Sequence, residues 1–443
     1  MKEQSNEQKP LIDQNLLNAC IHCGLCLPSC PTYLATGREL ESPRGRIYLL
    51  NLWQQNKAPF SKRMAEHLDS CLGCFGCQTA CPSGVNYEAI FNNAKVQVNS
   101  LTPIWYKLPR YLALRWLLPN DILLKLFASI LRAWQQVKAD YALGRVLLLL
   151  DKMQIAKEVL RWQSLLPSIP KHKNLALLTT GANQASSGVH LFKGCIMDIF
   201  YNHVNRECID LLALCTSQVC VPEQTCCGAL ALHSGEKNLA CYLAKKNIDK
   251  FGKSDDPIIA TASGCAAMLK SYPELFSEDD IWHDKAKVFS KRIKDLPEFL
   301  AQYEFESVSI KNIDKLKPFS IGYHAACHLS HAQGIRVAPK ILLENFAQAV
   351  NKAFSRQIVN IVPLIEEEYC CGSAGIYNLG HPILSERILA RKLEMIKESG
   401  VSIIVTTNPG CMLQLQSGIN AQGLGIQVLH LSSLLSKAYL SSF

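Results

Sequence analysis

The stretch CIHCGLCLPSCP (residues 20–31) and its counterpart CLGCFGCQTACP (residues 71–82) decide the fold of this 443-residue chain. Each has four cysteines in the order C-x2-C-x2-C-x3-C, and proline follows the last cysteine in both. A turn with this spacing wraps three sulfurs around one small centre, and the proline then fixes φ and redirects the chain. We name these stretches the first and second cysteine strings. Both predict metal sites.

The spacing of both strings is the bacterial pattern for [4Fe–4S] clusters, in which the fourth cysteine ligates the other cluster. One predicted cluster is held by Cys20, Cys23, Cys26 and Cys81, and the other by Cys71, Cys74, Cys77 and Cys30. The alternative is a pair of zinc sites, because C-x2-C also occurs in zinc ribbons. Zinc does not account for four cysteines in each string or for the repeated Cys-Pro. The sequence therefore favours two [4Fe–4S] clusters.

The overall composition agrees with a reduced, metal-binding chain. Its 20 cysteines are too many for a few buried thiols, and too few in a chain of this length for a secreted disulfide scaffold. The polar start MKEQSNEQKP lacks a secretory signal, and no uncharged apolar run reaches about 18 residues. We expect a cytoplasmic location. The net charge of +9 comes without a basic run or nucleic-acid motif, so no nucleic-acid partner is expected.

The segment between the strings predicts a helix. Residues 41–55, ESPRGRIYLLNLWQQ, have helical apolar spacing and lie between the two cysteine sets, so we expect a mostly helical domain over residues 1–100. Arg44 and Arg46 near the start of this helix have two interpretations. They either donate hydrogen bonds to cluster sulfurs or a partner carboxylate, or are solvated arginines.

The middle of the chain contains no cysteine and reads as a helical connector over residues 101–180. Apolar helical patterns occur at 105–119, 121–136 and 141–160, and residues 101–150 carry seven basic and two acidic side chains. Such helices either lie peripherally on an anionic membrane surface, here the inner face of the cell membrane, or pack on the cluster domain or a partner. GANQASSG, residues 181–188, reads as a linker.

The second half of the chain is duplicated. The surroundings of Cys195, Cys226 and Cys265 recur 132 to 146 residues later around three further cysteines: Cys327, Cys370 and Cys411. A period of this length indicates two domains rather than a solenoid. Strand-like runs (189–192, 257–262 and 401–407) alternate with helical patterns, which predicts parallel α/β domains over 189–315 and 316–443.

Each copy offers four thiols at the ends of predicted strands, where open α/β sheets place their sites. The first set is Cys195, Cys226, Cys227 and Cys265, and the second is Cys327, Cys370, Cys371 and Cys411. These thiols either hold a further iron–sulfur cluster, are redox-active, or are structural. His328 or His331 is available as an additional ligand. The remaining cysteines are expected to be buried apolar residues: Cys208, Cys215, Cys220 and Cys241.

Together, the two strings, the ESPRGRI segment between them and the two cysteine-rich domains with Cys-Cys-Gly sequences (CCG domains) resemble the family of glycolate oxidase iron–sulfur subunits. The resemblance implies an α+β protein with a helical ferredoxin-type two-cluster domain, a helical connector and two duplicated α/β cysteine-rich domains. Relatives with non-cubane clusters end each such domain in C-x-x-C, whereas here Met268 and Gln414 replace the last cysteine. The resemblance therefore implies at most four cysteine ligands in each copy.

The resemblance also implies an electron-transfer subunit that is not catalytic alone. In the family, FAD-binding subunits oxidise the 2-hydroxy acid, glycolate or D-lactate, and this subunit passes electrons to a quinone or other acceptor. No G-x-G-x-x-G follows a strand, so FAD is expected on the partner subunits only. The layout is similar to that of glycerol-3-phosphate dehydrogenase and heterodisulfide reductase subunits. Two other classes remain open, a stand-alone disulfide or quinone reductase and an iron–sulfur sensor.

Overall fold

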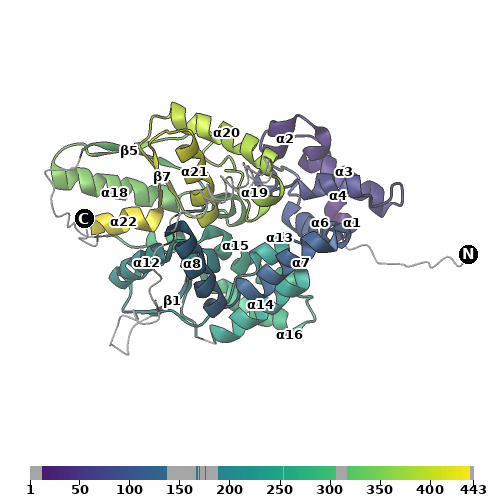
Figure 1. Ribbon diagram of the computed structural model, residues 1–443, viewed down its shortest axis with the longest axis horizontal. Helices are drawn as coiled ribbons and strands as arrows, with labels where there is room; N and C mark the ends of the chain where they lie inside the picture. The colour runs from purple at the N-terminus through teal and green to yellow at the C-terminus, as the bar shows by residue number, and fades with distance from the viewer. Residues whose placement is uncertain are drawn as a thin grey trace, which may run out of the picture.

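The computed structural model describes residues 12–136, 166, 167, 169, 175, 188–252, 254–305 and 317–439. It confirms the predicted α+β class, because helices build the first part of the chain and two small parallel sheets lie in the second half (Figure 1). The predicted helix at 141–160 and nearly all of the predicted linker at 181–188 lie outside the described residues.

The N-terminal part is helical, as the sequence predicts. Its elements are α1 (Gln14–Asn18), α2 (Pro31–Thr36), the 3-10 turn η1 (Glu39–Glu41), α3 (Pro43–Gln54), α4 (Lys62–Asp69), α5 (Gly76–Thr79) and α6 (Tyr87–Leu101). Pro31, the last residue of the first cysteine string, starts α2 directly, since its fixed φ suits the first helical position. The predicted helix between the strings is α3, which begins where the Ser42 side chain accepts a hydrogen bond from the Gly45 N–H.

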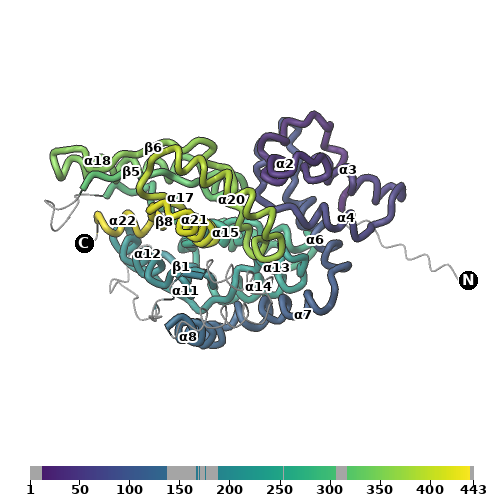
Figure 2. The backbone as a smooth tube through the Cα atoms, turned by 45° about the horizontal axis from the view of Figure 1, so that its top comes forward, coloured from purple at the N-terminus to yellow at the C-terminus, as the bar shows by residue number. Residues whose placement is uncertain are grey.

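Helices of the connector follow the predicted patterns. They are α7 (Ile104–Leu112), the π-helical turn η2 (Ala113–Leu117) and α8 (Asp121–Gln136). In Figure 2, α7 and α8 lie along the lower edge of the molecule. Only Leu114, Leu124 and Ala128 are buried in these three elements, so much of their apolar surface faces outward.

Each copy in the second half contains a four-stranded parallel sheet. The first unit has β1 (Gly188–Phe192), α11 (Cys195–Phe200), α12 (Asn202–Cys215), β2 (Gln218–Cys220), α13 (Ala229–His233), α14 (Lys237–Lys250), β3 (Ile258–Ala260), α15 (Ser263–Lys270), η4 (Tyr272–Leu275), α16 (Ile281–Lys291), β4 (Ile293–Asp295) and α17 (Leu296–Leu300). The second has β5 (Phe319–Tyr323), η6 (His328–Ala332), α18 (Ala338–Phe354), β6 (Val359–Val362), α19 (Tyr377–Gly380), α20 (Pro382–Glu398), β7 (Ile403–Thr406), α21 (Pro409–Ala421), β8 (Gln427–His430) and α22 (Leu431–Tyr439). The strand orders, β2-β1-β3-β4 and β6-β5-β7-β8, are the same.

The duplication and the parallel strands are thus confirmed, and the first strand of each copy pairs with the same neighbours in the same order. Phe192 at the end of β1 pairs with Ala260, and Tyr323 at the end of β5 pairs with Val405. The two units share one hydrophobic core, in which α12 of the first packs against α22 of the second. The N-terminal helices lie against the second unit, where α2 contacts α20 (Figures 1 and 2).

Candidate metal centres

The two cysteine strings fold so that each trailing cysteine lies with the other string. One cavity is lined by four thiols: Cys30, Cys71, Cys74 and Cys77. Burial raises the pKa of Cys20, and the nearby charges of Cys81 and Cys23 raise it further. Cys30 therefore lies with the second string and Cys81 with the first, as the crossed arrangement predicts. That these sulfurs bind clusters stays a prediction.

The loop of the second string depends on glycine at one position. Gly73 has φ of +65°, and a Cβ there would lie 2.8 Å from the Phe91 ring, so the backbone needs a residue without a side chain. This conformation directs the Gly73 N–H toward the Cys71 sulfur at 3.5 Å. Amides aimed at sulfur stabilise negative charge on it, as cluster loops require.

Arg46 lies buried beside this loop, with 1% of its surface exposed. Its Nη2 donates to Glu41 Oε2 at 3.1 Å, to Thr32 Oγ1 at 3.1 Å and to Ser70 Oγ at 2.8 Å, while Nε donates to the His67 carbonyl at 2.8 Å. Burial raises the pKa of Glu41, but hydrogen bonds from Ser70 and His67 and the charge of Arg46 lower it overall. The solvated interpretation is wrong for Arg46.

Arg44 behaves differently, although it is only two residues away. Its side chain is 29% exposed and forms an ion pair with Glu39 at 2.6 Å. Its Nη1 also donates to the His22 carbonyl at 3.1 Å, which ties the start of α3 to the first string. Arg44 is therefore a surface residue that braces the outer loop.

In the first copy, the four predicted thiols form a row. Cys195 and Cys226 have sulfurs 3.5 Å apart, and Cys227 lies between Cys226 and Cys265. Hydrogen bonds from Cys195 and Cys227 hold the pKa of Cys226 well below its usual value. All four lie beyond the carboxyl ends of parallel strands, as predicted.

In the second copy, the thiols form the matching row. Its order is Cys327, Cys370, Cys371 and Cys411. The last two sulfurs are 3.3 Å apart, and the Gly372 N–H points at the Cys370 sulfur at 3.4 Å. Of the two histidines that the sequence suggested, His328 lies beside this row, with Nδ1 3.5 Å from the Cys327 sulfur. His331 instead contacts Thr79 at 3.1 Å.

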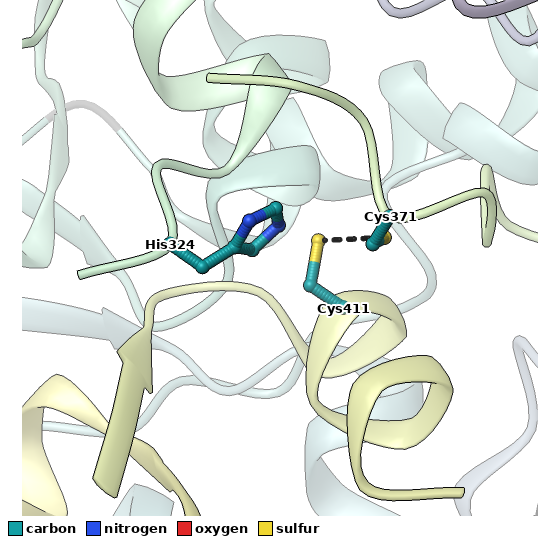
Figure 3. A group of neighbouring side chains, drawn as sticks. All are labelled: His324, Cys371 and Cys411. Carbon is teal, nitrogen blue, oxygen red and sulfur yellow. Dashed lines mark hydrogen bonds between the residues drawn. The ribbon is translucent and has the colours of Figure 1, made fainter. Parts of the chain in front are cut away.

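Sequence reasoning missed a third histidine. His324 follows β5 directly, and a ring nitrogen lies within 4.8 Å of the Cys371 and Cys411 sulfurs, which are themselves within this distance (Figure 3). Burial lowers the pKa of His324 well below its usual value, and the charge of Lys392 lowers it further. The sequence does show a histidine three residues before Cys327, at the end of an apolar run. Only the fold shows that Cys371 and Cys411 lie beside it.

The second row is linked to the cysteine strings on one side and to the first copy on the other. Cys74 lies near both Cys327 and Cys370. The charge of Cys327 raises the pKa of Cys74, and the charge of Cys74 raises the pKa of Cys370. On the other side, Asn408 bridges the copies, because Oδ1 accepts from the Gly264 N–H at 3.3 Å and Nδ2 donates to the Cys411 sulfur at 3.7 Å. The thiols thus form a connected series across the molecule.

Aromatic rings bridge the same junction. The imidazoles of His233 and His328 stack with centroids 5.5 Å apart, although they belong to different copies. Phe75, inside the second string, meets the His328 ring edge-on at 5.8 Å. Burial lowers the pKa of His233 to about 3, so this imidazole is neutral at physiological pH. The His233 side of this junction is consequently uncharged.

These donor sets fit iron–sulfur chemistry. The strings supply two sets of four sulfurs, the number that a [4Fe–4S] cluster takes. Burial raises the pKa of Cys74 and Cys77 well above the ordinary value, since a buried thiolate is disfavoured. Iron binds the thiolate, so metal binding and deprotonation are coupled at these positions.

The four remaining cysteines are less uniform than predicted. Cys208 is fully buried in α12, whereas Cys215, Cys220 and Cys241 are half-buried. Only Cys208 fully matches the expectation of a buried apolar residue.

The outer face of α7, η2 and α8 is apolar with basic side chains among the apolar ones. Its exposed apolar residues are Ile104, Trp105, Tyr106, Leu108, Leu112, Trp116, Ile122, Leu123, Leu126, Phe127, Ile130 and Trp134. Lys107, Arg115 and Lys125 lie in the same elements. Among the helices in the described part of the chain, we find none with the length and hydropathy needed to cross a bilayer.

Comparison with protein families identifies the two cysteine patterns. Residues 16–85 match the 4Fe-4S dicluster domain, and residues 189–270 and 321–416 each match the cysteine-rich domain called CCG. The first match covers both strings, and the other two cover both rows of thiols. Iron–sulfur clusters are therefore the cofactors of this chain.

Individual relatives match over most of the length. The chain is 33% identical to the probable glycolate oxidase iron-sulfur subunit of Bacillus subtilis, over 99% of this chain and 97% of the relative. It is 30% identical to the glycolate oxidase iron-sulfur subunit of Escherichia coli, over 94% of each chain. Lactate utilization protein A of an Exiguobacterium strain is 28% identical over 56% of this chain and 97% of its own length.

Proposed function

Because the chain belongs to the family of glycolate oxidase iron–sulfur subunits, we propose that it carries electrons from a separate FAD-binding flavoprotein, which oxidises glycolate to glyoxylate, toward a quinone or other acceptor. The observation that carries this proposal is the connected series of thiols, which runs from the surface at Cys23 through both strings into the duplicated units. Clusters spaced along such a series supply one-electron transfer.

The cluster ligands follow from the grouping of the sulfurs. The outer cluster is assigned to Cys20, Cys23, Cys26 and Cys81, and the inner cluster to Cys30, Cys71, Cys74 and Cys77. We assign a further iron–sulfur centre to the row that begins at Cys327, because it lies next to the inner cluster and gathers four cysteine sulfurs, the number that a [4Fe–4S] cluster takes. The chain's own part is to hold these centres in order and exclude water between them.

The outer cluster has the surface that a donor protein needs. Cys23 is exposed, and so are Ile21 (69%) and Leu25 (59%), each two residues away in the sequence. Tyr48 on α3 is 51% exposed. The Tyr48 ring meets His22 edge-on, so α3 joins the loop in one face. An exposed apolar patch beside a redox centre suits a protein partner. We therefore place the flavoprotein there.

The first expected result concerns substrate oxidation. The purified chain alone, with its clusters reconstituted, should not reduce an artificial electron acceptor when glycolate is added, because glycolate oxidation is assigned to the flavoprotein. Adding the flavoprotein should restore turnover and should pull this chain down in a binding assay. The measurement is glycolate-dependent dye reduction with and without the partner, with D-lactate as a second substrate. Turnover by the chain alone would refute the assignment and favour a stand-alone enzyme.

The connector face supplies a second proposal, peripheral contact with an anionic membrane. Apolar rings such as Trp105, exposed by 74%, alternate with basic side chains, and this combination binds acidic lipid surfaces. A quinone acceptor dissolved in the bilayer would then be near the chain. The alternative occupant, a protein partner, is an outcome of the following test.

The second expected result concerns vesicle binding. The chain should co-sediment with vesicles that contain phosphatidylglycerol, and Trp105→Glu should weaken binding about tenfold or more, because an apolar ring is lost and a negative charge gained. Ile281→Glu is the matched control, since Ile281 is 71% exposed on α16, outside the connector. Equal binding of both variants would contradict membrane contact. Loss of flavoprotein binding in Trp105→Glu alone would assign the face to the protein.

A further inference from the structure

His324 is buried without a hydrogen bond for either ring nitrogen. Only 1% of the residue is exposed, and among the described residues neither Nδ1 nor Nε2 has a hydrogen-bond partner. Buried polar groups in folded proteins are nearly always satisfied, so an orphaned imidazole needs an explanation. A metal ion or another bound group at this point would satisfy the ring.

The nearest candidates are two sulfurs. A ring nitrogen of His324 and the sulfurs of Cys371 and Cys411 all lie within 4.8 Å of one another. In Figure 3 the ring points from the end of β5 toward the two sulfurs, which approach from the loop after β6 and from α21. Three separate segments thus aim three donor atoms at one buried point.

The spacing suits ligands of the same metal ion. Two thiolates bound to one tetrahedral metal at about 2.3 Å lie about 3.8 Å apart, close to the 3.3 Å between Cys371 and Cys411. Neutral imidazole and thiolate are both good ligands for iron, and histidine replaces cysteine in some iron–sulfur centres. An iron at this point would also satisfy one of the two orphaned nitrogens.

We propose that His324 is a ligand of the metal centre in the second copy, where it binds one iron together with Cys371 and Cys411. This inference rests on the proposed function, which assigns an iron–sulfur centre to this row. Imidazole is neutral and thiolate is negative, so a histidine ligand raises the reduction potential of an iron–sulfur centre. The second copy would then attract electrons from the all-cysteine inner cluster next to it.

The duplication provides an internal comparison. Phe192 and His324 each lie three residues before the first cysteine of their row, Cys195 and Cys327, so they hold corresponding positions. Phe192 is fully buried and offers no donor atom, so the first copy has sulfur ligands only at this point. The two rows therefore hold chemically different sites despite the same strand order.

The test is pulsed EPR on the full chain, reduced and reconstituted with iron and sulfide, with and without 15N-labelled histidine. A directly bound imidazole should give a strong nitrogen coupling whose frequency changes with the isotope. His324→Phe, which places the first copy's residue in the second, should lose this coupling and shift the potential of that centre downward. His328→Phe and His331→Phe are matched controls that should keep it.

Iron analysis separates the two possible failures. Twelve or more iron atoms per wild-type chain with no histidine coupling would overturn the role of His324 and leave the centre in place. About eight iron atoms would mean two cubes only and would remove the proposed centre itself. A coupling that survives in His324→Phe, or disappears in His328→Phe, would also overturn the proposal. If His324→Phe fails to fold, an unchanged coupling in His328→Phe and His331→Phe still supports the proposal, and its loss in either variant overturns it.

Discussion

Replacing Cys30 by serine should remove the inner cluster, although Cys30 belongs to the first string. Cys30 lines the same cavity as Cys71, Cys74 and Cys77, so its loss leaves that set with three sulfurs. We expect about four fewer iron atoms per chain and loss of one cluster signal in the EPR spectrum of the reduced protein. Cys81→Ser should remove the other signal, because Cys81 lies beside Cys20.

The control for these variants is Cys220→Ser. Cys220 is half-buried in β2 and belongs to none of the thiol groups, so iron content and both signals should be unchanged. If Cys30→Ser lost only the signal that Cys20→Ser also loses, each string would hold its own cluster. The crossed arrangement would then be wrong.

Replacing Arg46 by alanine should destabilise the chain by about 3–5 kcal/mol, because it leaves the carboxylate of Glu41 buried without its cation. The same change removes hydrogen bonds to Thr32, Ser70 and the His67 carbonyl, and Ser70 precedes the second string. The temperature at which the visible cluster absorbance is lost should fall on the order of 10 °C. We expect the inner cluster to be lost first, since Arg46 lines its cavity.

Arg44→Ala is the matched control for Arg46→Ala. Its ion pair with Glu39 is partly exposed, and such pairs contribute about 1 kcal/mol or less. The same residue type, two positions away on the same helix, should thus have a far smaller effect. Equal shifts for both variants would show that Arg46 acts only as a helix residue and not as a buried cation.

The sequence predicted the parts of this molecule that depend on short-range spacing. Twelve residues set each cysteine string, and apolar periodicity placed the helix at 121–136 at the bounds that the structure has. The duplication was visible because both copies kept the same order of cysteines. The strands β2 and β4 were not predicted, whereas β3, which also has three residues, lies within the predicted run 257–262.

What the sequence could not predict depends on contacts between distant segments. Arg44 and Arg46 have the same side chain and similar neighbours in sequence, yet only Arg46 meets Glu41 and Ser70 in the interior. His324 and Cys411 are 87 positions apart in the chain, and they lie close together only because β5 and α21 pack in the same domain. The order of the four thiol groups across the molecule is equally a product of tertiary packing.

The gradient of burial along the thiol series has a practical consequence for handling the protein in air. Cys23 is exposed, whereas Cys30 and Cys77 are 6% and 8% exposed, so dissolved oxygen meets the outer cluster before the inner one. Oxidative damage should therefore start at the outer cluster, beside which we propose that the electron donor binds. A preparation damaged in this way would keep much of its iron and brown colour while its interior centres had become isolated from incoming electrons. Turnover, rather than colour, is the proper measure of an intact sample.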